Sequence, residues 1–149
     1  MNLGDVEIYS CKSLGAMPSN IEKGIPRASG TITLFDSETK SPVCILDAQV
    51  ISAIRTGAVS ALAAKKLMPQ NLESICLIGA GVNMRTQLMG MKTVFPNLQE
   101  VFVYSRGNSK YNFSEVMSSK LDLNIIPVNE PEVFVKKASA IITLSLIHI

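Results

Sequence analysis

The chain has 149 residues, 47% of them apolar and 17% charged, which is typical of a globular domain and excludes a disordered chain. Fourteen basic and twelve acidic side chains leave a net charge of +2, too balanced for a nucleic-acid-binding surface. Three scattered cysteines without a CxxC pair indicate reduced, buried thiols, and without a signal-peptide pattern or an apolar run of the roughly 20 residues that a membrane span needs, we expect a cytoplasmic protein.

The first fifty residues carry mainly strand signals. SGTITLFD, residues 29–36, alternates apolar and polar side chains, which predicts a half-buried strand. The turn-like DSETKS and then PVCIL, residues 42–46, predict that the two strands form a hairpin. We expect the preceding segment, which contains Pro18, Gly24 and Pro26, to be mostly loop.

An alanine-rich segment follows, and its apolar residues recur at helical spacing from Ile51 to Leu62. Asp47 or Ser52 is suited to cap the start of this helix, and Pro69 closes its end.

Beyond Gln70 the chain alternates between short apolar strands and amphipathic helices. The predicted strands are SICLIG, EVFVYS, NIIPV and AIIT, at 74–79, 100–105, 124–128 and 140–143. The predicted helices are VNMRTQLMGMKTVF, SKYNFSEVMSSKL and EPEVFVKKA, at 82–95, 109–121 and 130–138. This alternation predicts an α/β fold with a doubly wound parallel sheet and right-handed crossovers.

The Gly79-Ala80-Gly81 loop lies between the first of these strands and its helix. There the first glycine permits a tight turn, and the second lets a pyrophosphate approach the helix N-terminus. Met84 stands in place of a third glycine, a position that serves packing between helix and strand rather than phosphate contact. A GxG alone is also compatible with an ordinary strand-to-helix turn, although the strand–helix–strand context favours the cofactor interpretation.

The tip of the second strand reads Tyr104-Ser105-Arg106, and no carboxylate lies between Glu100 and Glu115. An NAD site usually places an acid there for the ribose 2′-hydroxyl. A hydroxyl with a guanidinium suits a 2′-phosphate instead, so the sequence favours NADP over NAD. A solvated basic turn is the alternative.

A set of motifs then carries a resemblance. They are a lysine near the start, P-S-N, a hairpin strand ending in Asp, I-S-x-x-R-T-x-A-x-S-A and GAG. With them the chain resembles the ornithine cyclodeaminase/μ-crystallin family, and its P-R-A-S segment is most like the dehydrogenases of the diaminopropionate-forming branch. The resemblance implies hydride transfer between a nicotinamide and the α-carbon of an amino acid or its imine. It also implies a homodimer.

The resemblance further implies a domain organisation: a partial β-rich substrate and dimerisation domain (1–50), a connecting helix (51–69) and a partial Rossmann-like NAD(P)-binding domain (70–143). The family's first strands and one substrate-binding arginine would precede Met1, and its catalytic aspartate would follow the fourth strand, so we expect a fragment truncated at both ends. The last six residues, 144–149, match the in-frame translation of a sequencing-library adapter. We expect this tail, with His148, to be non-native.

Carried over to this sequence, the family's roles fall on a small set of side chains. Arg55 would clamp the substrate α-carboxylate, because a guanidinium holds a carboxylate bidentately. Lys12 would be the acid/base or polarising group near the amino nitrogen or the attacking water. Arg27 would read a second carboxylate. The expected cofactor-binding residues are Thr56, Gly79, Ala80, Gly81, Val82, Asn83, Ser105 and Arg106, and no metal site is expected.

Two of these roles have plain structural alternatives. Lys12 is otherwise a solvated loop lysine. Arg55 lies in an apolar helix, where a buried cation needs a partner. For the whole protein, the alternatives to an enzyme are a μ-crystallin-like protein that binds NADPH and a small ligand without turnover, and a nucleotide-binding module without chemistry.

Overall fold

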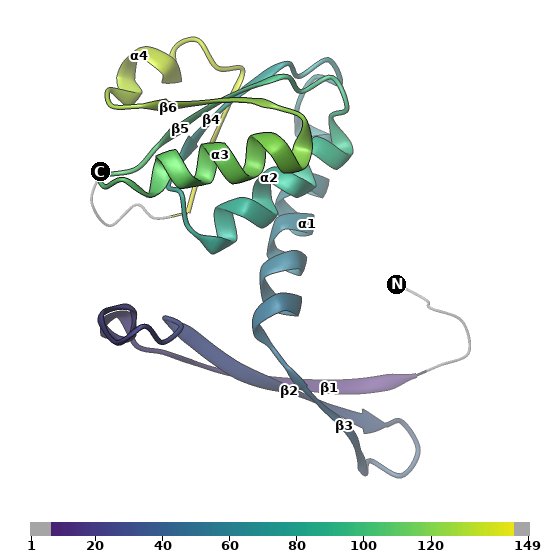
Figure 1. Cartoon of the computed structure of the whole chain (residues 1–149). Helices are drawn as coiled ribbons and strands as arrows, with labels where there is room; N and C mark the ends of the chain where they lie inside the picture. The colour runs from purple at the N-terminus through teal and green to yellow at the C-terminus, as the bar shows by residue number, and fades with distance from the viewer. Residues whose placement is uncertain (1–6, 145–149) are drawn as a thin grey trace. The chain divides into compact units, whose positions relative to one another are not determined.

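The computed structural model describes residues 7–144 (Figure 1). The chain divides into two compact units, Met1–Ser52 and Ala53–Ile149. The domain organisation implied by the resemblance, with a connecting helix at 51–69, stays a prediction.

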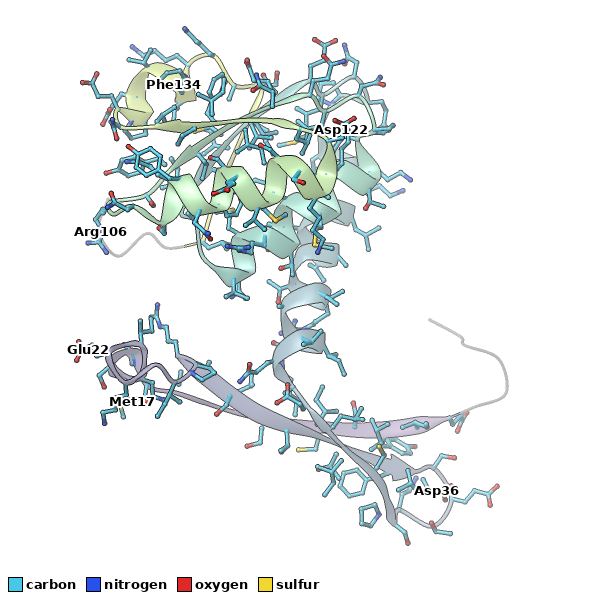
Figure 2. The ribbon with its side chains drawn as sticks, in the orientation of Figure 1. Met17, Glu22, Asp36, Arg106, Asp122 and Phe134 are labelled. Atoms are coloured by element: carbon cyan, nitrogen blue, oxygen red, sulfur yellow. The ribbon has the colours of Figure 1, made fainter. Side chains whose placement is uncertain are left out.

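The first unit contains a three-stranded antiparallel sheet in the order β1-β2-β3. The strands are β1 (Ile8–Ala16), β2 (Ala28–Asp36) and β3 (Pro42–Asp47), so the predicted hairpin of β2 and β3 is confirmed. At its turn, labelled by Asp36 in Figure 2, the Asp36 carboxylate accepts hydrogen bonds from the backbone N–H groups of Thr39 (2.7 Å) and Glu38 (3.0 Å). The Thr39 backbone bond, then its hydroxyl, lowers the pKa of Asp36 below its ordinary value.

The prediction that the segment before β2 is mostly loop is wrong. Residues 8–16 form β1, which pairs with β2 along its whole length, and Pro18–Lys23 form a 3-10 helix, η1, that ends at Gly24 with φ of 69°. Every residue of β1 is exposed. The strand therefore has no buried face that could impose an alternation of apolar and polar residues on its sequence. Pairing with β2, rather than a hydrophobic pattern, defines this strand.

Helix α1 (Gln49–Leu67) begins as predicted from an aspartate. The Asp47 carboxylate accepts a hydrogen bond from the Gln49 backbone N–H at 2.8 Å, whereas Ser52, the other candidate cap, lies inside the helix.

The second unit contains a parallel sheet in the order β6-β5-β4-β7. Its strands are β4 (Ser74–Ile78), β5 (Glu100–Tyr104), β6 (Asn124–Val128) and β7 (Ala140–Thr143). Its helices, besides α1, are α2 (Val82–Val94), α3 (Ser109–Leu121) and α4 (Pro131–Val135). The predicted α/β fold with an alternating, all-parallel sheet is therefore confirmed.

Alternating side chains of the central strands supply two cores. Ile75 and Leu77 of β4 belong to the larger core, together with α2 and α3 side chains such as Leu88 and Phe113. Cys76, between them in the sequence, faces the smaller core on the other side, against which Phe134 of α4 packs. Helices thus cover both faces of the sheet, α2 and α3 on one and α4 on the other (Figure 1). This is the doubly wound arrangement.

Helices α1 and α2 approach each other backbone to backbone. A Cβ atom on Gly57 of α1 would lie 2.3 Å from the Thr86 carbonyl oxygen, and one on Gly90 of α2 would lie 2.8 Å from the Gly57 carbonyl oxygen. No side chain fits at that spacing, so the crossing requires glycine on both helices.

We therefore expect Gly57→Ala to destabilise the protein even though alanine has the higher helix propensity. The added methyl group has to push two helix backbones apart, and overpacking of this kind costs about 1–3 kcal/mol. Chemical denaturation monitored by circular dichroism measures the free energy of unfolding. Gly107→Ala is the control, since a Cβ there meets nothing within 4 Å. Equal stability of the two variants would contradict the proposed contact.

Candidate cofactor and substrate site

The glycine loop is held between two strands of the parallel sheet. The Gly79 backbone N–H donates a hydrogen bond to the Tyr104 carbonyl oxygen at 2.8 Å, which continues the β4–β5 ladder past its last pair. Gly79 has φ of 122°, a conformation that side chains disfavour, whereas Gly81 has φ of −88° and ψ of −178°. The backbone conformation therefore requires glycine only at Gly79.

The backbone conformation of Gly81 does not require glycine, but the absence of a side chain leaves the start of α2 accessible. It lies directly before α2, it is exposed, and a Cβ on it would meet nothing within 4 Å. No side chain caps α2, and its first turn carries no acidic residue. The first N–H groups of a helix have no partner within the helix, so this open end can accept an anion such as a pyrophosphate. The residues present thus fit a dinucleotide.

Met84, which replaces a third glycine, is buried with 1% of its surface exposed. It belongs to the core between α2 and the sheet, and its methyl group lies 3.6 Å from where a Cβ on Gly79 would be. The interpretation of Met84 as a packing residue is confirmed.

The end of β5 lies at the same edge of the sheet, because β4 and β5 are parallel and Ile78 pairs with Tyr104. The Ser105 hydroxyl lies 2.9 Å from the Ser109 hydroxyl and donates to the Gly107 carbonyl oxygen at 3.1 Å. Arg106 is exposed (Figure 2), and within residues 7–144 its side chain makes no hydrogen bond or ion pair. The turn therefore presents a cation to solvent.

Lys110 follows this turn in the sequence, where it was considered only as part of a solvated basic turn; in the structure it is buried. Its Nζ donates to the Ser105 carbonyl oxygen at 3.3 Å, and the residue is only 6% exposed. In the sequence, Lys110 stands near the start of a predicted helix with no acidic residue nearby, and this pattern was the signal that could have singled it out.

Lys12 lies in β1 opposite Ile32. Its Nζ donates a hydrogen bond to the Ser52 hydroxyl at 3.2 Å. From the sequence, Ser52 was considered only as a helix cap. Its place in the I-S-x-x-R-T motif was the signal that could have indicated its second role, as the partner of Lys12. Among the described residues, the partner of the Lys12 ammonium is thus a neutral hydroxyl rather than a carboxylate.

Both predicted substrate-binding arginines are exposed. The argument that Arg55 needs a partner because its helix is apolar is therefore wrong, since its side chain faces solvent rather than the core. Arg27 lies just before β2, where its carbonyl oxygen accepts a hydrogen bond from the Met17 backbone N–H at 2.8 Å. Lys12 and Arg27 belong to the first unit and Arg55 to the second.

Thr56 is half-buried and precedes Gly57, the residue at which α1 meets α2. Its contact with a phosphate stays a prediction.

The cysteines follow the expectation only in part. Cys76 is buried, and burial raises the pKa of its thiol, whereas Cys44 is half-buried and Cys11 is exposed. The expectation that all three are buried is wrong for Cys11, because β1 carries no core face.

Residues 7–144 also lack two broader features. No group of three histidine, cysteine, aspartate or glutamate side chains there could hold a metal ion. Likewise, none of the helices in that range is both long and apolar enough to span a membrane. His148 and the rest of the predicted tail after Leu144 lie outside the described residues.

Comparison with known proteins identifies relatives along nearly the whole chain. The sequence pattern of the ornithine cyclodeaminase/mu-crystallin family matches residues 1–147. N-((2S)-2-amino-2-carboxyethyl)-L-glutamate dehydrogenase of Staphylococcus aureus is 32% identical, over 96% of this chain and 44% of its own. L-lysine cyclodeaminase of Streptomyces rapamycinicus is 29% identical, over 87% of this chain and 37% of its own.

A solved structure agrees in fold. Delta(1)-pyrroline-2-carboxylate reductase of Thermococcus litoralis, in complex with NADH and L-proline, superposes with a TM-score of 0.86 at 32% identity. The match covers 90% of this chain and 42% of the reductase. The chain thus spans less than half the length of the relatives it matches.

The two glycines of the loop should respond differently to alanine. Gly79→Ala is expected to lower the free energy of unfolding by about 1–3 kcal/mol, because alanine is strained at a positive φ of this kind. Gly81→Ala is expected to change it by less than about 0.5 kcal/mol, since the position is open and extended. Thermal unfolding of both variants tests this difference. A Gly81→Ala variant as unstable as Gly79→Ala would contradict the assignment of conformation to one glycine and access to the other.

Proposed function

The chain belongs to the ornithine cyclodeaminase/mu-crystallin family, and we propose that the full-length protein is an NAD(P)-dependent amino-acid dehydrogenase or cyclodeaminase. The reaction is hydride transfer at the α-carbon of an amino acid or its imine. The observation that carries the proposal is the open N-terminus of α2 beside the Gly79–Gly81 loop, in a fold whose relatives include a dehydrogenase, a reductase and a cyclodeaminase. A homodimer is proposed from the same resemblance, and a cytoplasmic location is proposed from the scattered, unpaired cysteines of the sequence.

The proposed cofactor is NADP(H), with NAD(H) as the alternative. The backbone from Gly79 to Asn83 would hold the pyrophosphate, and Ser105 and Arg106 would face the ribose 2′-position at the tip of β5. Arg106 is exposed and forms no ion pair within residues 7–144, and the first turn of α3 carries no acid. Bound NADH in the Thermococcus litoralis reductase supports a nicotinamide cofactor in general. The charge at the tip favours the 2′-phosphate.

The proposed substrate contacts are made by exposed cations. Arg55 would hold the α-carboxylate through two parallel hydrogen bonds. Arg27 would hold a second carboxylate, which agrees with a relative that acts on a glutamate carrying an amino-carboxyethyl group.

A nicotinamide held by the proposed cofactor-binding residues would supply the hydride chemistry at the substrate α-carbon. Lys12 would move the proton on the amino nitrogen, or on the water that attacks the imine. Its Nζ is hydrogen-bonded to the neutral Ser52 hydroxyl, so releasing a proton breaks no ion pair. A cyclodeaminase reaction also requires a side-chain amine on the substrate that attacks the imine.

The second candidate is a μ-crystallin-like protein that binds the cofactor and a small ligand without turnover. The relatives reported above have enzyme names, which favours turnover. Tight cofactor binding with no oxidation or reduction of any amino acid or imine tested would support the binding protein instead.

The direct test is a spectrophotometric assay of the full-length protein with NADPH or NADH and a panel of cyclic and linear imines. Arg55→Met should lower kcat/KM by about 100-fold, because charge-assisted hydrogen bonds contribute about 1.5–3 kcal/mol. Lys12→Met should mainly lower kcat and remove one limb of the pH profile. Lys66→Met, an exposed lysine in the last turn of α1, is the matched control. Full activity of both Arg55→Met and Lys12→Met would refute the assigned roles.

Arg27 is expected to set the preference for dicarboxylic substrates. In Arg27→Thr, kcat/KM for a substrate with two carboxylates should fall about tenfold or more relative to that for a monocarboxylate, because one charge-assisted contact is lost. Lys23→Thr, an exposed lysine of η1, controls for the loss of a positive charge from the same segment. An unchanged ratio of kcat/KM values would exclude Arg27 from substrate recognition.

A further inference from the structure

Lys110 is a buried cation at the tip of β5. It is the second residue of α3 and 6% exposed. The only hydrogen bond of its side chain among the described residues runs from Nζ to the Ser105 carbonyl oxygen, at 3.3 Å.

Three features make this position unfavourable for a positive charge in the ligand-free protein. Burial removes the ammonium from water. The N-terminus of a helix carries a partial positive charge, so a cation in the first turn is repelled. The first turn of α3 has no acidic residue, and the sequence from Val101 to Ser114 contains none.

The contacts of Lys110 compensate for this only partly. The rings of Tyr104 and Tyr111 have centroids 5.8 and 5.5 Å from Nζ, near the outer limit for a cation–π interaction. The bond to the Ser105 carbonyl is long and has a neutral acceptor. A methionine or leucine would fill the same space without the charge. An anion at the tip of β5 would relieve all three penalties.

We propose that Lys110 is a specificity-determining residue that reserves the tip of β5 for the 2′-phosphate of NADP(H). The proposal rests on the proposed function, in which the Gly79–Gly81 loop binds a dinucleotide. Because of the parallel register of β4 and β5, Ser105 would then lie near the adenosine ribose. Arg106 reaches the same group from solvent, where salt screens its charge, whereas the field of the buried Lys110 is screened much less.

The test combines stability with binding in the full-length protein. Lys110→Met keeps the length of the side chain and removes its charge, and Lys110→Arg keeps the charge. Lys120→Met is the matched control, an exposed lysine in the last turn of the same helix. Differential scanning fluorimetry gives Tm without ligand, and fluorescence titration gives Kd for NADPH and for NADH. Titration with adenosine 2′,5′-bisphosphate and 5′-AMP isolates the 2′-phosphate.

Lys110→Met is expected to raise or maintain the Tm of the ligand-free protein. It should also raise Kd for NADPH and for the 2′,5′-bisphosphate about tenfold or more, as the loss of one charge-assisted contact predicts. Kd for NADH and for 5′-AMP should change by less than about twofold. Lys110→Arg should restore most of the affinity for NADPH. The control Lys120→Met should bind every ligand as the wild type does.

Other outcomes overturn the proposal. A lower Tm, with NADPH binding and NADH binding weakened equally, means that Lys110 only holds the Ser105 turn. Unchanged NADPH affinity in Lys110→Met excludes Lys110 from recognition even though the cofactor site exists. Failure of the wild-type protein to bind either dinucleotide refutes the proposed function itself, and is distinguishable because the wild type is affected.

Discussion

The parallel register between β4 and β5 is the constraint on which the candidate cofactor site depends. Ile78 pairs with Tyr104, and the next backbone N–H, that of Gly79, donates to the Tyr104 carbonyl oxygen. That bond carries the ladder one residue into the loop and fixes where the chain leaves the sheet. The glycine loop and the Ser105 turn consequently emerge at the same edge, although they are more than 20 residues apart in the sequence.

Small residues perform three different tasks around this edge. Gly79 adopts a positive φ, Gly81 leaves the N-terminus of α2 open, and Gly57 allows α1 to approach the backbone of α2 at Thr86. The approach of the helices at Gly57 supports the roles of Gly79 and Gly81, because it helps to hold α2 in place. Helix α2 lies between α1 and the sheet and is packed there through buried residues such as Leu88. The packing thus anchors one end of the glycine loop to the core.

The cations of the candidate sites have few internal partners. Lys12 has a neutral hydroxyl, Lys110 has a backbone carbonyl, and Arg55 and Arg106 make no ion pair with any of residues 7–144. In ordinary surfaces and cores, cations are solvated or paired. Proteins that act on carboxylates and phosphates need cations whose charge is not already neutralised, and the arrangement agrees with the proposed anionic substrate and cofactor.

The sequence alone determined the α/β class, the hairpin, the parallel strands with their helices and the packing role of Met84, because each rests on local periodicity or on a short motif. Tertiary structure decided the rest. Strand β1 carries no hydrophobic pattern and exists through pairing with β2; Arg55 proved to be exposed on an apolar helix; and the contacts from Lys12 to Ser52 and from Lys110 to Ser105 depend on side-chain placement. Periodicity reports which face of an element is apolar, but only packing determines which side chains are covered and which polar atoms they meet.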